Sequence, residues 1–408
     1  MTSYGGAGGG AGGGAGGGAG GGAGGGAGGG AGGTGSDVGL YGAETFLKSH
    51  AGSPPSPLLS SALILSQDAT VSYWDGESTL TPTEHSESLT AYLKEVRMPT
   101  QALILDCHVR NLIGVEWSIA ETISDDGNGD DEEAAAEDDV DGKCEFIVSP
   151  VIKMTVRKPK DSVSGQADIL TVATVTKPDP DYFEKDLHWL RNYSDLRSDR
   201  LAEIYHQTGD IISFFGALGF LDNGRRKYTL LLLEAVRSVA VHVETLAKFI
   251  GRQKRPIDYA MEVQPMIQTP DHSSFPSGHA LEAFAIATVL HRLSDTGSAV
   301  DGIRDNARPF LLAHRISTNR TVAGVHFPVD SLAGAFLGLH LGELIHSIAT
   351  GTSIQLGELG KPTTPVDEEK TEDFLLSSFL THLGNPVDGG TQSDELVAWF
   401  WDKARQEW

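Results

Sequence analysis

Residues 248–256 read KFIGRQKRP, residues 276–279 read PSGH, and residues 319–330 read NRTVAGVHFPVD. These three blocks contain cationic side chains, a hydroxyl beside a glycine, two histidines and a carboxylate. A phosphoryl group nearing its transition state spreads negative charge over three oxygens, so its transfer needs several fixed donors and a positioned nucleophile. The stretch from 248 to 330 therefore predicts a pocket for a tetrahedral oxyanion and a fold that assembles it.

The expected anion-binding residues fall in all three blocks. Lys248, Arg255 and Arg320 supply positive charge, while Ser277 and the backbone N–H of Gly278 add neutral donors. Glycine lets the main chain approach the anion closely. The apolar run ALEAFAIATVL that follows PSGH predicts a helix, and its N-terminus would point backbone amides at the same anion.

The catalytic candidates are His326, His279 and Asp330. His326 and Asp330 are four residues apart, a separation that places two side chains on one face of a helix. Asp330 is therefore expected to hold the His326 ring in one tautomer.

The order and spacing of these blocks resemble a signature shared by type 2 phosphatidic acid phosphatases, bacterial class A acid phosphatases and vanadium-dependent haloperoxidases. That signature reads Lys, six residues, Arg-Pro; then Pro-Ser-Gly-His; then Ser-Arg, five residues, His, three residues, Asp. The first two blocks match it fully. The third departs only at Asn319, where the family usually has Ser.

The resemblance implies a phosphohydrolase that cleaves phosphate monoesters through a phosphohistidine, without a cofactor. His326 would attack phosphorus, and His279 would protonate the leaving oxygen. The alternative that it implies is a vanadium-dependent haloperoxidase, which oxidises halide with hydrogen peroxide. In that case vanadate would occupy the pocket, His326 would ligate vanadium, and His279 would serve peroxide activation.

Local sequence favours the phosphatase without excluding the haloperoxidase. The segments SSFPSGHA and GVHFPVDSLAG resemble the corresponding sequences of phosphatases more than those of fungal chloroperoxidase. His272, however, lies seven residues before His279, in a neighbourhood where bromoperoxidases carry an additional histidine near the metal. A histidine at such a place is more often an ordinary loop residue, so the phosphatase reading is preferred.

Net charge limits the possible partners. The chain carries a formal charge of −24 and has a pI near 4.9, which argues against nucleic acid and against docking on an anionic membrane. Against this background, the first block concentrates positive charge in Lys248, Arg252, Lys254 and Arg255. A small phosphorylated or oxyanion ligand is therefore the expected partner, and the oligomeric state is not indicated.

No membrane span is expected. The apolar stretches at 230–243 and 332–348 are interrupted by charged residues and histidines, and the N-terminus lacks the basic start and apolar core of a signal peptide. These features predict a cytoplasmic protein, unlike the lipid phosphatases of the superfamily, which are polytopic membrane proteins.

The fold class expected is mainly α, a helical bundle carrying the anion site, preceded by a β-rich region. Residues 1–35 are dominated by Gly and Ala and predict a disordered tail. Residues 36–180 contain the branched runs ATVSYW, ALILDCHV, EFIVSPVIKMTV and DILTVATV, which predict an antiparallel sheet. Residues 181–408 have helical periodicity and form the expected catalytic domain.

Two further features concern metals. The acidic loop 125–141 begins with calcium-loop spacing at Asp126, Asn128 and Asp130, but it lacks the glycine at position six and the closing glutamate, so a disordered insertion is preferred. Cys107 and Cys144 are the only cysteines and have no metal-ligand spacing, so no zinc site is expected.

Overall fold

The computed structural model describes residues 57–70, 88–94, 96–121, 148–158, 168–362 and 371–408. The predictions made for the tail 1–35, the acidic loop 125–141 and Cys144 lie outside these residues.

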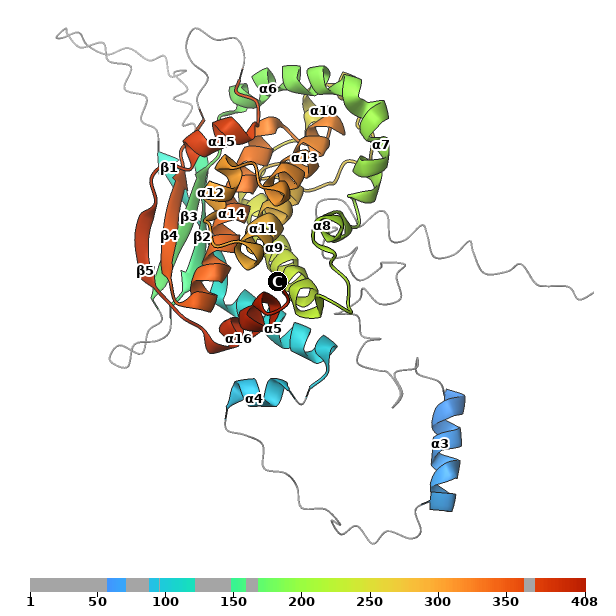
Figure 1. The fold of residues 1–408 in the computed structure, drawn as a ribbon. Coiled ribbons are helices and arrows are strands. Elements are labelled where there is room, and N and C mark those ends of the chain that lie inside the picture. The colour runs from blue at the N-terminus through green and yellow to red at the C-terminus, as the bar shows by residue number, and fades with distance from the viewer. Residues whose placement is uncertain (1–56, 71–87, 95, 122–147, 159–167, 363–370) are drawn as a thin grey trace, which may run out of the picture.

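Four long helices form the centre of the molecule (Figure 1): α9 (Lys227–Gly251), α11 (Gly278–Ser294), α13 (Arg308–Val322) and α14 (Pro328–Thr350). A sheet lies along one side of them, α7 and α8 lie on the opposite side, and α6 runs across the top of the view. The remaining described helices are α3 (Pro57–Thr70), α4 (Leu89–Leu93), α5 (Met98–Leu112), α6 (Pro180–Tyr193), α7 (Arg197–His206), α8 (Ile212–Gly219), α10 (Pro256–Tyr259), α12 (Ala299–Arg304), α15 (Leu376–His382) and α16 (Glu395–Arg405). The expectation of a mainly α fold is confirmed.

Three of the four helices that deliver the sequence blocks begin or end at the residues that local sequence favours, and the fourth, α13, carries Arg320 and was not predicted. Helix α9 ends at Gly251, and Arg252 then adopts the left-handed conformation with φ 47°, which terminates the helix three residues before Arg255. Helix α11 starts directly after Ser277, and α14 starts with Pro328 at its first turn, where proline loses no hydrogen bond. The three blocks therefore lie at helix ends.

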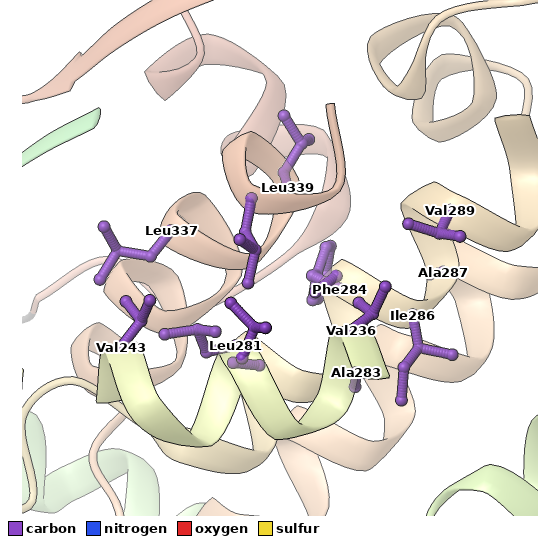
Figure 2. Close-up of a cluster of buried hydrophobic side chains, with 14 of the residues drawn as sticks. Val236, Val243, Leu281, Ala283, Phe284, Ile286, Ala287, Val289, Leu337 and Leu339 are labelled. Carbon is purple, nitrogen blue, oxygen red and sulfur yellow. The ribbon is translucent and has the colours of Figure 1, made fainter. Parts of the chain in front are cut away.

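Helices α11 and α14 pack with their backbones close together. A Cβ atom at Gly338 would overlap the carbonyl oxygen of Leu281, one at Gly334 would overlap the carbonyl oxygen of Ser277, and one at Gly342 would overlap the side chain of Thr288. Figure 2 shows the apolar side chains that fill the space between α9, α11 and α14, among them Val236, Leu281 and Leu337. This close packing fixes the relative positions of the helix ends that carry the site.

The sheet has the strand order β1 (Ile113–Glu121), β2 (Val148–Arg157), β3 (Ile169–Thr176), β4 (Ser353–Leu359) and β5 (Val387–Thr391). Pairs β1–β2, β2–β3 and β4–β5 are antiparallel, while β3 and β4 are parallel, with Ala173 opposite Gly357. Alternate residues of β2, namely Ile152, Met154 and Val156, are buried in the core. The sheet thus covers one side of the bundle.

The N-terminal region differs from its prediction in two respects. The run ALILDCHV, expected as a strand, lies within the helix α5, where Ala102, Leu105 and Val109 are buried at helical spacing. The sheet, expected to be antiparallel, is mixed, because β4 from the C-terminal part of the chain pairs in parallel with β3. The runs EFIVSPVIKMTV and DILTVATV do supply β2 and β3. The run ATVSYW overlaps the end of α3 and otherwise lies outside the described residues.

Helix α14 corrects the expectation about membranes. The helix has 23 residues, and an 18-residue window within it has a mean hydropathy of 1.3. By length and composition it could therefore cross a bilayer. In the structure, 89% of that apolar window is buried against other elements, as in the core helix of a globular protein. The prediction that the chain contains no possible span was wrong, and the predicted cytoplasmic location, which rested on it, is corrected with it.

Candidate active site

Lys248 holds the loop that leads into the PSGH block. Its side chain is buried near the end of α9, and Nζ donates to the carbonyl oxygens of Ser273, Ser274 and Pro276 at 3.2, 3.4 and 2.6 Å. Burial, and then the charge of Arg255, lowers the pKa of Lys248 to about 7. Lys248 therefore fixes the loop that carries Ser277 and adds a titratable charge to the site.

Arg255 and Asp330 determine the tautomer of His326. Arg255 Nη1 lies 3.1 Å from His326 Nε2, and because a guanidinium can only donate, Nε2 must accept. The ring proton is therefore on Nδ1, which donates to Asp330 Oδ2 at 3.0 Å. Burial, followed by the charges of Arg255 and Lys248, holds the pKa of His326 well below its ordinary value. His326 thus has an uncharged ring with a lone pair on Nε2.

The His326–Asp330 contact arises at a helix cap. His326 precedes α14, and Asp330 lies in the first turn, where Oδ2 also accepts from the backbone N–H of Phe327 at 2.9 Å. The spacing of four residues correctly predicted the contact, but the two residues do not share a helical face as expected. The same carboxylate caps the helix and orients the histidine.

His279 is held by the segment after α7. Its Nε2 lies 2.9 Å from the backbone carbonyl oxygen of Gln207, which can only accept, so Nε2 carries a proton. Burial, and then the charge of Arg320, holds the pKa of His279 well below its ordinary value. In the neutral ring the lone pair is on Nδ1, which is buried and has no partner among the described residues.

Arg320 is buried, and only some of its N–H groups have a hydrogen-bond partner. Its Nη2 donates to the carbonyl oxygen of Ile204 at 3.2 Å and to Gln207 Oε1 at 3.1 Å. Its Nε and Nη1 are buried without a partner among the described residues. A buried, unpaired guanidinium donor is costly, so such donors usually face a ligand or water.

His272 contacts the same site from the loop before PSGH. Its Nδ1 lies 3.2 Å from Arg255 Nη2, which can only donate, and 3.2 Å from the carbonyl oxygen of Ser273, which can only accept. Nε2 is buried without a partner in the described part of the chain. Burial, followed by the charges of Lys248 and Arg255, lowers the pKa of His272 to about 4. His272 is therefore a neutral residue beside the predicted anion-binding arginine.

Asn319, the one departure from the sequence signature, links α13 to α7. Its Nδ2 donates to Glu203 Oε2 at 3.1 Å and to Gln207 Oε1 at 3.0 Å, while its Oδ1 accepts from Arg200 at 2.9 Å. A serine is too short to make all three contacts. Asn319 therefore holds α13 against the segment around Gln207, and Gln207 contacts both His279 and Arg320.

Glu244 was not anticipated from the sequence. It lies one helical turn before Lys248 in α9, and a Cβ atom at Gly278 would overlap its Oε2, so glycine is required there for close approach. Both carboxyl oxygens are buried without a partner among the described residues. Burial, and then the neighbouring Glu282, raises the pKa of Glu244 well above its ordinary value. The sequence feature that could have indicated Glu244 was its position four residues before Lys248, which places both side chains on one face of α9.

The structure brings all the predicted site residues into one connected region. A chain of contacts runs from His272 through Arg255 to His326 and Asp330. The carbonyl oxygen of Asp330 accepts from the Ser277 N–H at 2.8 Å, which joins the third block to the second. Ser277 Oγ is itself buried without a partner among the described residues. Gln207, which the sequence did not single out, connects His279 to Arg320.

Comparisons with known proteins match the part of the chain that contains the three sequence blocks. Residues 228–352 match the model of the PAP2 superfamily, a range that contains all three sequence blocks. The decaprenylphosphoryl-5-phosphoribose phosphatase of Mycobacterium tuberculosis (strain CDC 1551 / Oshkosh) is 30% identical over 141 residues, which cover 35% of this chain and 71% of the relative. The undecaprenyl-diphosphatase of Sulfolobus acidocaldarius is 30% identical over 100 residues, or 24% of this chain and 45% of the relative.

Among solved structures, the chain is similar to one described as the first transmembrane PAP2 type phosphatidylglycerolphosphate phosphatase from Bacillus subtilis. The two share 22% identity with a TM-score of 0.30, over 40% of this chain and 84% of the other. The mycobacterial relative is matched over most of its length, and the family model covers all three sequence blocks. The chain therefore belongs to the PAP2 superfamily, and both the mycobacterial and the Sulfolobus relatives are named as phosphatases.

Proposed function

We propose that the protein is a phosphohydrolase that cleaves phosphate esters through a phosphohistidine intermediate on His326. The observation that carries the proposal is a set of buried polar atoms in the site that lack partners within the described chain. These are Ser277 Oγ, His279 Nδ1, His272 Nε2, and Nε and Nη1 of Arg320. Burying such groups unpaired costs about 1–3 kcal/mol each. A bound phosphoryl group would satisfy the donors and offset the cost.

The first chemical step uses the lone pair on His326 Nε2. This nitrogen attacks phosphorus, and the bond between phosphorus and the ester oxygen breaks. Arg255, which contacts Nε2 in the free enzyme, would then donate to an equatorial oxygen of the phosphoryl group. Asp330 stabilises the positive charge that develops on the ring by accepting from Nδ1. A histidine held neutral by burial is suited to this role.

The second role belongs to His279, which transfers protons. In its protonated form it donates from Nδ1 to the leaving oxygen, because Nε2 stays bonded to the Gln207 carbonyl. Arg320 depresses the pKa of His279, and a bound anionic substrate offsets that charge and favours the protonated form. After the alcohol leaves, neutral His279 takes a proton from water, which attacks phosphorus and releases phosphate and His326.

The names of the relatives guide the choice of substrate. One relative is named for decaprenylphosphoryl-5-phosphoribose and another for undecaprenyl diphosphate. We therefore propose phosphate esters that carry a polyprenyl group as substrates to be tested beside simple monoesters. A polyprenyl phosphate and a short alkyl phosphate assayed in parallel separate recognition of the apolar group from the chemistry at phosphorus.

One observation favours a second activity. His272, seven residues before His279, contacts Arg255 and has a buried Nε2 without a partner in the described chain. The donors that suit phosphate also suit vanadate, which His326 Nε2 would hold. When bound, vanadate would supply the peroxide chemistry of a haloperoxidase, and His272 would be a neutral histidine beside it.

Two assays on one preparation separate these activities. The protein is incubated with p-nitrophenyl phosphate, and separately with vanadate, hydrogen peroxide, bromide and monochlorodimedone. Phosphate release without halogenation supports the phosphohydrolase. Halogenation that requires added vanadate, without phosphate release, would replace the proposal by the haloperoxidase. No turnover of any tested ester and no halogenation would count against both.

The two histidines should separate kinetically. His326→Ala is expected to abolish the acid-quenched phosphoenzyme, whereas His279→Ala should slow alkyl phosphates far more than aryl phosphates, whose leaving groups need no protonation. The measurement is single-turnover phosphorylation with both esters. His314→Ala is the matched control, because His314 is a partly buried histidine whose Nε2 bonds a backbone carbonyl outside the site. Equal losses for both site variants on both esters would contradict the assigned roles.

A further inference from the structure

Gln207 contacts two residues of the site, although it belongs to none of the three sequence blocks. It follows α7, outside the range 228–352 that matches the family model, and it is 1% exposed. Its backbone carbonyl accepts from His279 Nε2 at 2.9 Å. Its side-chain Oε1 accepts from Arg320 Nη2 at 3.1 Å. One residue thus contacts both the proposed acid and a proposed anion-binding cation.

The orientation of the Gln207 amide is determined by its neighbours. Oε1 accepts from two donors, Arg320 Nη2 and Asn319 Nδ2, so the amide nitrogen must occupy the other position. That nitrogen, Nε2, is buried and has no partner among the described residues. It adds a further atom to the buried, unpartnered polar atoms of Ser277, His279 and Arg320.

The contact with Arg320 also limits how that guanidinium can turn. Nη2 is occupied by Gln207 Oε1 and the Ile204 carbonyl, while Nε and Nη1 remain available. A planar guanidinium fixed at one nitrogen presents its other donors in a defined direction. Gln207 is neutral, so it fixes this direction without opposing the negative charge of a ligand.

We propose that Gln207 is a further oxyanion-binding residue, with Oε1 fixing Arg320 and Nε2 donating to an oxygen of the bound phosphoryl group. This inference rests on the proposed function, because it assumes that an oxyanion occupies the pocket. It adds to the site a residue from the segment after α7, which neither the sequence blocks nor the matched family range contains.

Sulfate binding tests the proposal, because sulfate keeps its charge over the whole working range of pH. Gln207→Met removes both the acceptor and the donor and is expected to weaken sulfate binding at least tenfold at every pH. Gln207→Glu keeps the shape and the acceptor. Its new carboxyl resembles the amide when protonated and repels sulfate when ionised. Its loss of affinity should therefore grow between pH 5.5 and 8.5, a signature that a purely structural role would not produce.

Gln101→Met is the matched control, because Gln101 is a buried glutamine whose amide donates to the carbonyls of Leu93 and Val96, away from the site. It should leave the sulfate dissociation constant unchanged. Titration calorimetry measures all four proteins, and thermal melting reports whether each is folded. If wild type binds sulfate and both Gln207 variants bind it equally well at all pH values, this inference fails alone. If the wild-type protein binds neither sulfate nor vanadate, the proposed function fails and this inference with it.

Discussion

At the residue scale, the site combines strong burial with several positive charges. Lys248, Arg255 and Arg320 are each at most 3% exposed, and each would be costly to bury without compensating contacts. The three cations obtain those contacts mainly from backbone carbonyls, which leaves the negative charge to be supplied by the ligand. Carboxylates nearby serve other purposes, since Asp330 orients His326 and Glu244 has a raised pKa that favours its neutral form.

The lowered pKa of Lys248 predicts how anion affinity depends on pH. Because that pKa is about 7 instead of its ordinary value, Lys248 loses its charge in the free enzyme as pH rises through 7. A bound anion favours the charged form, so binding takes up a proton above that pH. Sulfate affinity should therefore fall above pH 7, approaching about tenfold per pH unit at the steepest. Titration calorimetry at intervals from pH 6 to 9 measures it.

Two variants isolate the contribution of Lys248. Lys248→Met should bind sulfate weakly and with a flatter dependence on pH. Lys254→Met, which removes an exposed lysine from the same sequence block, should keep the wild-type profile. A wild-type affinity that stays constant between pH 7 and 9 would contradict the assignment.

At the element scale, the geometry of the site depends on the contact between α11 and α14. Their N-terminal ends carry Ser277 and Asp330, and the Ser277 N–H donates to the Asp330 carbonyl across the interface. The small residues of α14 permit this approach, since any side chain at Gly338 would meet the backbone of α11. The small residues of α14 therefore allow the two helices to pack closely and also bring Ser277 and Asp330 together.

Gly338→Ala should destabilise the fold and the site together. The new methyl group would overlap the Leu281 carbonyl oxygen, a backbone atom that can move only with its helix. Overpacking of this kind costs typically 1–3 kcal/mol, and denaturant unfolding should show a loss of about that size. Gly360→Ala is the control, because a Cβ there meets no atom within 4 Å. Equal stability of the two variants would show that the helices can separate without cost.

At the scale of the whole molecule, the C-terminus closes the bundle at the end far from the site. Glu407 accepts from the backbone N–H groups of Tyr228 and Thr229 at 2.9 and 2.8 Å, which caps the start of α9. Trp408 lies against Arg226, with the guanidinium carbon 3.3 Å from a ring centroid. Lys248, near the opposite end of α9, is about 30 Å away at 1.5 Å per residue. The C-terminal contacts that stabilise the start of α9 are therefore spatially separated from the anion site.

Glu407→Gln should lower stability without altering the site. Loss of a charged acceptor at a helix N-terminus costs about 1 kcal/mol, which corresponds to roughly 2–4 °C in Tm for a domain of this size. Sulfate affinity should remain at the wild-type value, because the change lies at the far end of α9. Asp402→Asn, an exposed position of α16, serves as the control for charge removal. A large fall in sulfate affinity would show that the two ends of α9 are coupled.

The sequence by itself determined the residue types of the site and three of the helices that carry them, whereas α13, which carries Arg320, was not predicted. Local signals were sufficient for those three helices, because Gly251 ends one helix, PSGH begins another and Pro328 begins a third. The spacing of His326 and Asp330 was also informative, since four residues bring the two groups together at a helix cap. These features depend on neighbours in the chain, so a pattern of residues is enough to predict them.

Only the tertiary structure decided which distant residues complete the site. Gln207 reaches His279 and Arg320 across long separations in sequence, and no local pattern marks such a residue. The same reason explains the errors: ALILDCHV is a helix because its apolar residues face a core formed by distant elements, and α14 combines the composition of a membrane span with a buried position. Whether an apolar segment meets lipid or protein depends on what packs against it, and sequence periodicity alone does not contain that information.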